Sequence, residues 1–124
     1  MILKEMANIL VSNDLGVLGV NLFIHHMPQT VESGILLLDR MPGATIDHEL
    51  RGMLRGGFQA IVRTTTYDET LARAIMNALS IESRIVEGLD VKYILPKSEP
   101  FAYPATDGKN IEYSVNFDAV YAKT

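Results

Sequence analysis

The segment from Gly57 to Leu79 constrains the fold most, because its hydrophobic period changes in the middle. Up to Thr65 the side chains alternate between two sides, which is the period of a β-strand. From Tyr67 to about residue 81 the apolar residues recur every three or four positions, which is the period of a helix. Thr66 and Glu69 have the spacing of a capping box at the junction. A strand that runs directly into a helix favours a domain in which helices pack on a sheet.

This strand has two faces of different character. One face carries Phe58, Ala60, Val62 and Thr64, and the other carries Gln59, Ile61, Arg63 and Thr65. The first face is the more apolar, so we expect it to meet the helices. On the second face we predict Gln59 and Arg63 as contacts to another subunit, with Arg63 either exposed at a rim or paired across strands. In the following helix, Glu69 and Arg73 are spaced for an ion pair.

The clearest alternation of the sequence lies in its last part, from Ile111 to Tyr121. Every second residue there is apolar, and most of the residues between are polar. Such a strand extends about 35 Å and exceeds the usual five or six residues. It therefore either spans the sheet or projects to pair with something outside it.

The rest of the chain is predicted to supply one helix and three shorter strands. Residues 1–14 place their apolar side chains on one helical face, with Gly16 ending the helix at positive φ. Strands are expected over residues 20–27, 35–38 and 89–95, the first two as an antiparallel hairpin, with 82–88 as a plain connection. We predict a single α+β domain over residues 1–124, with a mixed, mostly antiparallel sheet of four to five strands and two helices on one face.

Composition excludes several classes of protein. The 124 residues contain no cysteine, so neither a disulfide framework nor a thiolate site is possible. The net charge of −4 argues against a broad basic face for nucleic acid. Lys4 and Glu5 interrupt any early apolar run, so no secretory signal is expected. No segment approaches the roughly 18 apolar residues of a membrane span, so no membrane contact is expected.

Two long segments outside the predicted elements hold further candidate contact residues. Residues 41–56 contain Asp47, Glu49, Arg51 and Arg55, and residues 97–110 contain Phe101 and Tyr103. Loops longer than about 12 residues are usually functional or disordered. The carboxylates near His48 fan out along the chain rather than converge, so we expect no metal there. Phe101 and Tyr103 either anchor a partner or fold back on the domain, and both alternatives stay open.

The sequence carries no motif of a known catalytic centre. It has no Gly-rich phosphate loop and no nucleophile elbow. We therefore expect neither catalysis nor a cofactor. We expect instead that the domain acts through contact with other molecules. The alternatives are a small enzyme that uses His48 with Arg51 and Arg55, and a nucleic-acid-binding module.

The layout and two short segments resemble the phage minor capsid and tail terminator family. The first is Gly57-Phe58-Gln59-Ala60-Ile61-Val62-Arg63, followed by Tyr67 and an Ala-rich helix, and the second is Glu112-Tyr113-Ser114-Val115-Asn116-Phe117-Asp118. The resemblance implies a structural virion protein, neither an enzyme nor a cofactor binder. It implies a location at the head–tail junction, with assembly in the host cytoplasm.

In that family the subunits form a ring, usually of six copies, on the head-proximal end of the tail tube. The resemblance implies that the ring ends tube polymerisation, binds the tube protein and docks the head-completion or connector protein. DNA would pass through the lumen without specific binding. Six copies of a chain with net charge −4 would carry about −24, which repels phosphates. Another ring protein of the neck, such as a stopper, is the alternative within the virion.

Overall fold

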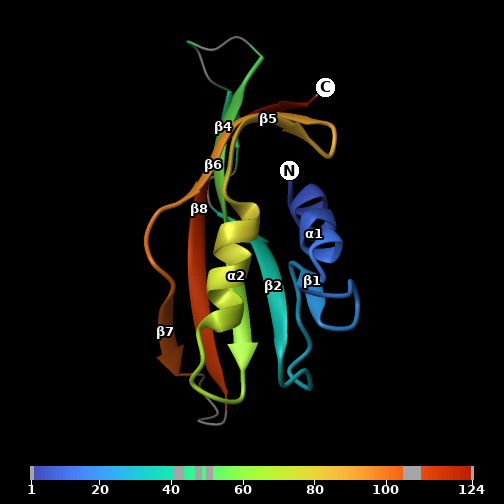
Figure 1. The fold of residues 1–124 in the computed structure, drawn as a ribbon, viewed down its shortest axis with the longest axis vertical. Helices are drawn as coiled ribbons and strands as arrows, with labels where there is room; N and C mark the ends of the chain where they lie inside the picture. The colour runs from blue at the N-terminus through green and yellow to red at the C-terminus, as the bar shows by residue number, and fades with distance from the viewer. Residues whose placement is uncertain (1, 41–43, 47–48, 50–51, 105–109, 124) are drawn as a thin grey trace.

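The computed structural model describes residues 2–40, 44–46, 49, 52–104 and 110–123. Figure 1 shows both helices of this part of the chain on the same side of a twisted sheet. The α+β prediction is confirmed, although the described residues form eight strands rather than four or five. The elements in chain order are α1 Leu3–Ser12, β1 Leu22–Ile24, β2 Gly34–Asp39, β3 Thr45–Ile46, β4 Leu54–Thr64, α2 Thr70–Leu79, β5 Ile81–Val86, β6 Leu89–Pro96, β7 Phe101–Pro104 and β8 Ile111–Lys123.

The sheet is mixed and mostly antiparallel, as predicted. Its main strand order is β1-β2-β4-β8-β6-β5, with β3 beside β4 and β7 beside β8. Among the described strands only β1 and β2 pair in parallel. The strands that the sequence did not predict are short or polar. β3 has two residues, β7 has four, and most of β5 is exposed at the sheet edge.

The pairing of β4 with β8 forms the centre of the sheet. All 11 residues of β4 have partners in β8, from Leu54 opposite Tyr121 to Thr64 opposite Ile111. The rings of Phe58 and Phe117 stack across this pair with centroids 4.8 Å apart. The long final strand therefore spans the sheet, which is the first of the two alternatives that its length left open.

The core lies between the helices and the face of β4 that was predicted to meet them. Leu3, Met6 and Leu10 of α1 and Ala72, Ile75 and Leu79 of α2 are fully buried. They share one hydrophobic cluster with Phe58, Ala60 and Val62 of β4 and with Tyr113, Val115 and Phe117 of β8. The period-two pattern thus assigned the buried face of both strands correctly.

The predicted hairpin between residues 20–27 and 35–38 is wrong, because β1 runs parallel to β2. β1 ends at Ile24, and His25 adopts φ 69°, which turns the chain out of the strand. The segment from His26 to Ser33 then leads the chain back to the start of β1, where the Ile35 amide donates to the Asn21 carbonyl. This return path makes the two strands run in the same direction.

The predicted capping box is also wrong, because α2 begins at Thr70 and not directly after Thr66. The residue before the helix, Glu69, makes no side-chain capping hydrogen bond. Asp68, one position earlier, bonds the first residue of the helix instead. Its Oδ1 accepts from the Thr70 amide at 2.9 Å and from the Thr70 hydroxyl at 2.6 Å. These two hydrogen bonds lower the pKa of Asp68. The predicted ion pair of the first turn is confirmed, with 2.9 Å between Arg73 Nε and Glu69 Oε1.

Two further predictions need correction. Residues 82–88 are no plain connection, because β5 extends to Val86 and turns into β6 through Glu87 and Gly88 at positive φ. In β6 the register shifts between Val91 and Tyr93, so Ile94 is buried and Leu95 is 36% exposed. A simple alternation had placed Val91 and Leu95 on the same face.

Gly56 and Gly57 allow two close approaches on β4. A Cβ at Gly57 would lie 2.7 Å from the Phe117 carbonyl oxygen and 2.9 Å from Arg40 Nη1. A Cβ at Gly56 would lie 2.9 Å from the Cα of Ala44. The first obstacle belongs to the central strand β8, whereas the second precedes the two-residue edge strand β3.

We predict that Gly57→Ala destabilises the fold more than Gly56→Ala does. Overpacking against a central strand costs about 1–3 kcal/mol of unfolding free energy, whereas a short edge segment can shift away. Urea unfolding of both variants measures the difference. Equal unfolding free energies for Gly57→Ala and the unsubstituted chain would contradict this account of the strand contact.

Candidate assembly surface

The side of the sheet opposite the helices is called here the helix-free face. Both helices in the described residues pack on the other side, and the strand registers place alternate residues on this one. Its members are Phe23 of β1, Leu36 and Leu38 of β2, Arg55, Gln59, Ile61 and Arg63 of β4, Tyr93 and Leu95 of β6, Phe101 and Tyr103 of β7, and Glu112, Ser114, Asn116, Asp118 and Val120 of β8.

A row of apolar side chains crosses this face. The register aligns Phe23 with Leu36 and Leu36 with Ile61. Beyond Ile61, the row continues through Ser114 to Phe101 on the far side of β8. Phe101 is 49% exposed, so the row ends in an aromatic ring that is accessible to a partner.

The centre of the face is held by side-chain hydrogen bonds. Ser114 is 1% exposed, and its hydroxyl accepts from Gln59 Nε2 at 2.6 Å. Asn116 Nδ2 donates to the same oxygen at 3.5 Å. A buried hydroxyl with amide donors on neighbouring positions fixes the orientation of both amides. Both amides are therefore held in fixed orientations on this part of the face.

Arg63 is paired across strands, which was one of the two predicted alternatives. Its Nε donates to Glu112 Oε2 at 3.1 Å, and both side chains are largely buried. Its Nη1 donates to the carbonyls of Pro28 at 3.1 Å and Val31 at 3.0 Å. The guanidinium thus holds the segment between β1 and β2 against the end of strand β4, and it also lies on the predicted contact face.

The other cations of this region also have partners within the chain. Arg40 Nη1 donates to Asp118 Oδ1 and to the Phe117 carbonyl, both at 3.4 Å. Arg55 Nη1 donates to the Tyr93 hydroxyl at 3.1 Å. Burial, and secondarily the charge of Glu112, raises the pKa of Tyr103. The face is thus a mixture of apolar groups and internally paired charges.

The structure gathers five of the predicted contact residues on this one surface. Gln59 lies in its centre, Arg55 toward the start of β4, Arg63 toward the end of β4, and Phe101 and Tyr103 on β7. Glu49 is exposed, and Asp47 and Arg51 lie outside the described residues. The sequence did not indicate Leu95 or Tyr93, because only the register shift in β6 turns them to this side.

The described residues hold no cluster of three or more His, Asp or Glu side chains placed to bind a metal ion. His25 Nε2 lies 3.8 Å from Asp39 Oδ2 as an exposed pair. No described helix is both long enough and apolar enough to cross a membrane.

The described residues form a small α+β domain with one helix-covered face and one face of mixed polarity that no described helix covers. The model of the bacteriophage tail terminator protein family matches residues 9–123, and the chain belongs to that family. It is therefore a structural protein of the phage tail and a component of the virion, as the resemblance had implied.

The other comparisons inform on the fold alone. No curated protein matches the chain. Among solved structures, the fold is similar to a chain from the "virion of native gene transfer agent (GTA) particle", with a TM-score of 0.61 and 13% identity. That similarity covers 94% of this chain and 83% of the other.

We predict that Arg63→Ala lowers the unfolding free energy by about 2 kcal/mol, because it removes three charge-assisted hydrogen bonds and leaves Glu112 unpaired. Arg84→Ala is the matched control, since Arg84 is exposed on β5 and has no ion pair within the described residues. Its effect should stay within about 0.5 kcal/mol. Denaturant titrations at low protein concentration measure both variants. Equal unfolding free energies for Arg63→Ala and Arg84→Ala would contradict a structural role of Arg63.

Proposed function

We propose that the chain forms a ring, of six copies, at the head-proximal end of the tail tube. There it ends tube polymerisation and presents the surface on which the head-completion or connector protein docks. Assembly takes place in the host cytoplasm. The observation that carries the proposal is the match of the tail terminator family over residues 9–123, in a fold that leaves one sheet face open.

The size of the helix-free face supports its use as a protein contact. Six strands about 4.8 Å apart, along a central strand about 35 Å long, span on the order of 800 Å². That is the area which one partner contributes to a standard protein–protein interface. The exposed Phe101 and Leu95 supply apolar surface, and the amides of Gln59 and Asn116 supply hydrogen-bonding groups.

The charges of this face support a protein partner rather than DNA. Phosphate binding requires cations that are free to replace counterions. Arg40 and Arg63 are instead neutralised by Asp118 and Glu112. With a net charge of −4 per chain, a ring would let DNA pass through its lumen without holding it.

The proposed role needs neither catalysis nor a cofactor. It rests on contact surfaces, and the family is one of structural tail proteins. The family match also favours the end of the tail tube over another ring of the neck. The enzyme alternative used His48 and Arg51, which lie outside the described residues, and Arg55, which contacts Tyr93 across the sheet.

We predict that the purified chain limits the length of tubes formed by its tail tube protein. Phe101→Ser changes the helix-free face. The concentration of the chain that halves the tube length should rise roughly tenfold, because an interface aromatic contributes more than 1 kcal/mol to binding. Tube lengths in electron micrographs measure the effect.

Tyr67→Ser is the matched control, because Tyr67 is 77% exposed on the turn before α2 and lies outside this face. Both variants should unfold at the same denaturant concentration as the unsubstituted chain. Tubes of unchanged length with the unsubstituted chain would contradict the proposed function. If Phe101→Ser and Tyr67→Ser weakened the limit on tube length equally, the helix-free face would not be the contact surface.

A further inference from the structure

Two short strands at opposite corners of the sheet have a free outer edge. β3 pairs with β4, β7 pairs with β8, and neither has a second neighbour among the described residues. The outer backbone groups of such an edge lack the hydrogen bonds that a neighbouring strand supplies. Neither strand contains a charged residue, and both expose apolar groups, with Ile46 70% exposed and Phe101 49%.

The edge outside β5 is protected against a further strand. Ser83, in the middle of β5, takes the left-handed conformation at φ 50°, which departs from strand geometry. Glu82 and Arg84 flank it, and both are exposed. Charges and local irregularities of this kind keep an edge from pairing with another chain.

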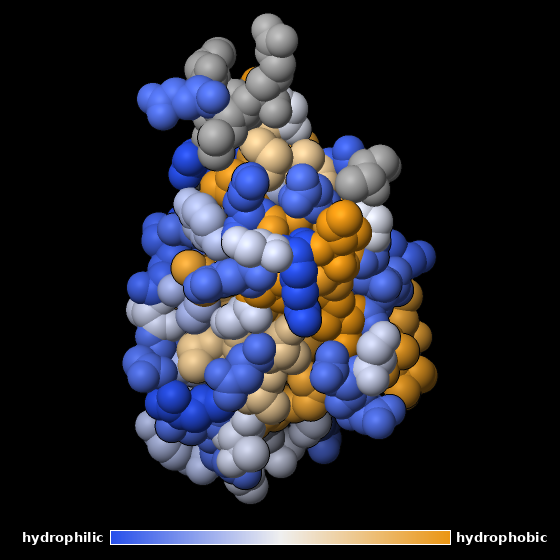
Figure 2. All heavy atoms as spheres, turned by 45° about the horizontal axis from the view of Figure 1, so that its top comes forward, coloured by the Kyte–Doolittle hydropathy of each residue, from blue (hydrophilic) through white to orange (hydrophobic). Residues whose placement is uncertain are grey.

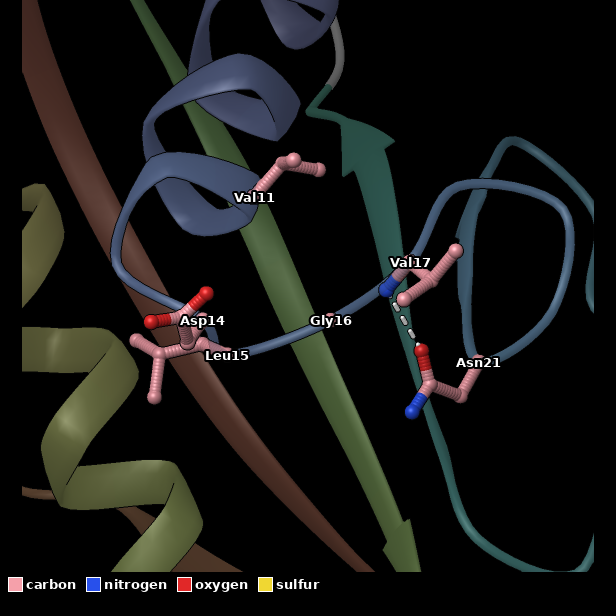
Figure 3. Close-up of a pocket in the computed structure, with 6 residues that line it drawn as sticks. All are labelled: Val11, Asp14, Leu15, Gly16, Val17 and Asn21. Carbon is pink, nitrogen blue, oxygen red and sulfur yellow. Dashed lines mark hydrogen bonds between the residues drawn. The ribbon is translucent and has the colours of Figure 1, made fainter.

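The edge outside β1 is covered by the loop that follows α1. Leu18 forms a bridge to Leu22 at the start of β1, and the Gly19 amide donates to the Leu22 carbonyl at 2.9 Å. Figure 3 shows the hollow of about 260 Å³ between this loop and the end of α1, with Asn21 Oδ1 accepting from the Val17 amide at 2.6 Å. In Figure 2 hydrophobic surface gathers toward the right-hand side, where α1 and this loop lie. The loop occupies the position that a further strand beside β1 would need.

The two unprotected edges match in direction. β3 runs antiparallel to β4, β4 to β8, and β8 to β7, so β3 and β7 run in opposite directions. They also lie on opposite sides of the central pair of β4 and β8. Two copies side by side in the same orientation would therefore place β7 of one copy antiparallel to β3 of the other.

The side chains of the two strands lie on matching faces. Ile46 and Ala102 pair with strand residues that belong to the hydrophobic cluster or pack against it, so both lie on the helix side. Thr45 and Tyr103 lie on the helix-free face. In the antiparallel register that sets Ile46 opposite Ala102, Thr45 is opposite Tyr103. A β-branched residue opposite an aromatic one is a favourable cross-strand pair.

Within one chain β3 and β7 do not meet. Two strands separate them, and Thr45 lies level with Val120 of β8 whereas Tyr103 lies level with Glu112, eight positions away. Pairing between copies thus displaces them by about 27 Å along the strands and about 19 Å across them, or about 33 Å in all. A compact domain of 124 residues is about 35 Å across, so the bodies of the two copies can touch side by side.

We infer that β3 of one copy pairs antiparallel with β7 of the next copy, with Ile46 beside Ala102 and Thr45 beside Tyr103. The inference rests on the self-association in the proposed function and names the strands that carry it. Two different edges make this a head-to-tail contact, which repeats from copy to copy and closes into a ring when the rotation fits. The sheet then continues between copies, and the helix-free face stays available to another protein.

The absence of cysteine from the sequence allows a direct test. The full-length variants Ile46→Cys and Ala102→Cys are mixed with tail tubes and oxidised. Residues directly opposite each other on paired strands have Cβ atoms about 5 Å apart, close to disulfide geometry, so the mixture should give a dimer that contains one of each variant. A chain with both substitutions should give a ladder of covalent oligomers that ends at the number of copies in the ring.

Ile85→Cys is the matched control for Ile46→Cys, because Ile85 is 72% exposed but lies on the protected edge of β5. Mixed with Ala102→Cys, it should give at most a tenth of the dimer. Each single variant alone should also give at most a tenth.

A charge exchange tests the same contact without crosslinking. A chain with Ile46→Lys and Ala102→Lys should associate severalfold more weakly, because like charges directly opposite each other destabilise strand pairing. A chain with Ile46→Lys and Ala102→Glu should associate as the unsubstituted chain does. Both positions are exposed, so both chains should unfold at the same denaturant concentration as the unsubstituted chain.

Equal association of the two charged chains, or a control dimer as abundant as the mixed dimer, would overturn the inference. If copies associate by mass measurement but give no mixed dimer, the inference fails and the proposed ring stands. If the chain stays a monomer and binds no tube, the proposed function fails, and the inference fails with it.

Discussion

The pairing of β4 with β8 is the interaction on which the rest of the structure depends. It joins residues that lie from 47 (Thr64 and Ile111) to 67 (Leu54 and Tyr121) positions apart in the chain, and it provides the ladder from which the other strands of the sheet extend. Phe58 and Phe117 stack on its helix side, and Gln59 bonds Ser114 on the other. Because side chains alternate along a strand, this single ladder sets the composition of both faces of the sheet.

The two faces of the sheet differ in what covers them and in their charges. The helix side is closed by α1 and α2 and forms the core. The open side holds its charges in internal pairs, Arg63 with Glu112 and Arg40 with Asp118. Such pairing keeps the face near neutral, so its accessible groups are apolar side chains and amides. A surface of this kind suits contact with protein and not with phosphate.

The long alternating strands could be predicted from the sequence because their periodicity is a local property. The buried sides of β4 and β8 and the ion pair of Glu69 with Arg73 follow from spacing alone. The parallel pairing of β1 could not be predicted, since it depends on the turn at His25 and on a return path fixed by a distant residue, Arg63. The edge strand β5 was missed because its exposed side chains carry little hydrophobic pattern.

The candidate surface was predictable in part for the same reason. Gln59 and Arg63 were identified from the alternation of one strand. Phe101 and Tyr103 were identified as aromatics in a long segment, but their place beside Ser114 and Glu112 comes from the pairing of β7 with β8. Leu95 joins the surface only through the register shift in β6, for which the sequence has no local signal. The left-handed residue after α1 is likewise Asp14 and not the predicted Gly16.

A reconstruction of the intact virion at side-chain resolution tests the central claim most directly. The account predicts a ring of this chain on the head-proximal end of the tail tube, with the helix-free face covered by protein and the paired Arg63 and Glu112 beneath the contact. A ring elsewhere in the particle would contradict the proposed function. A helix-free face that lies open to solvent or lines the DNA channel would contradict its assignment as an assembly surface.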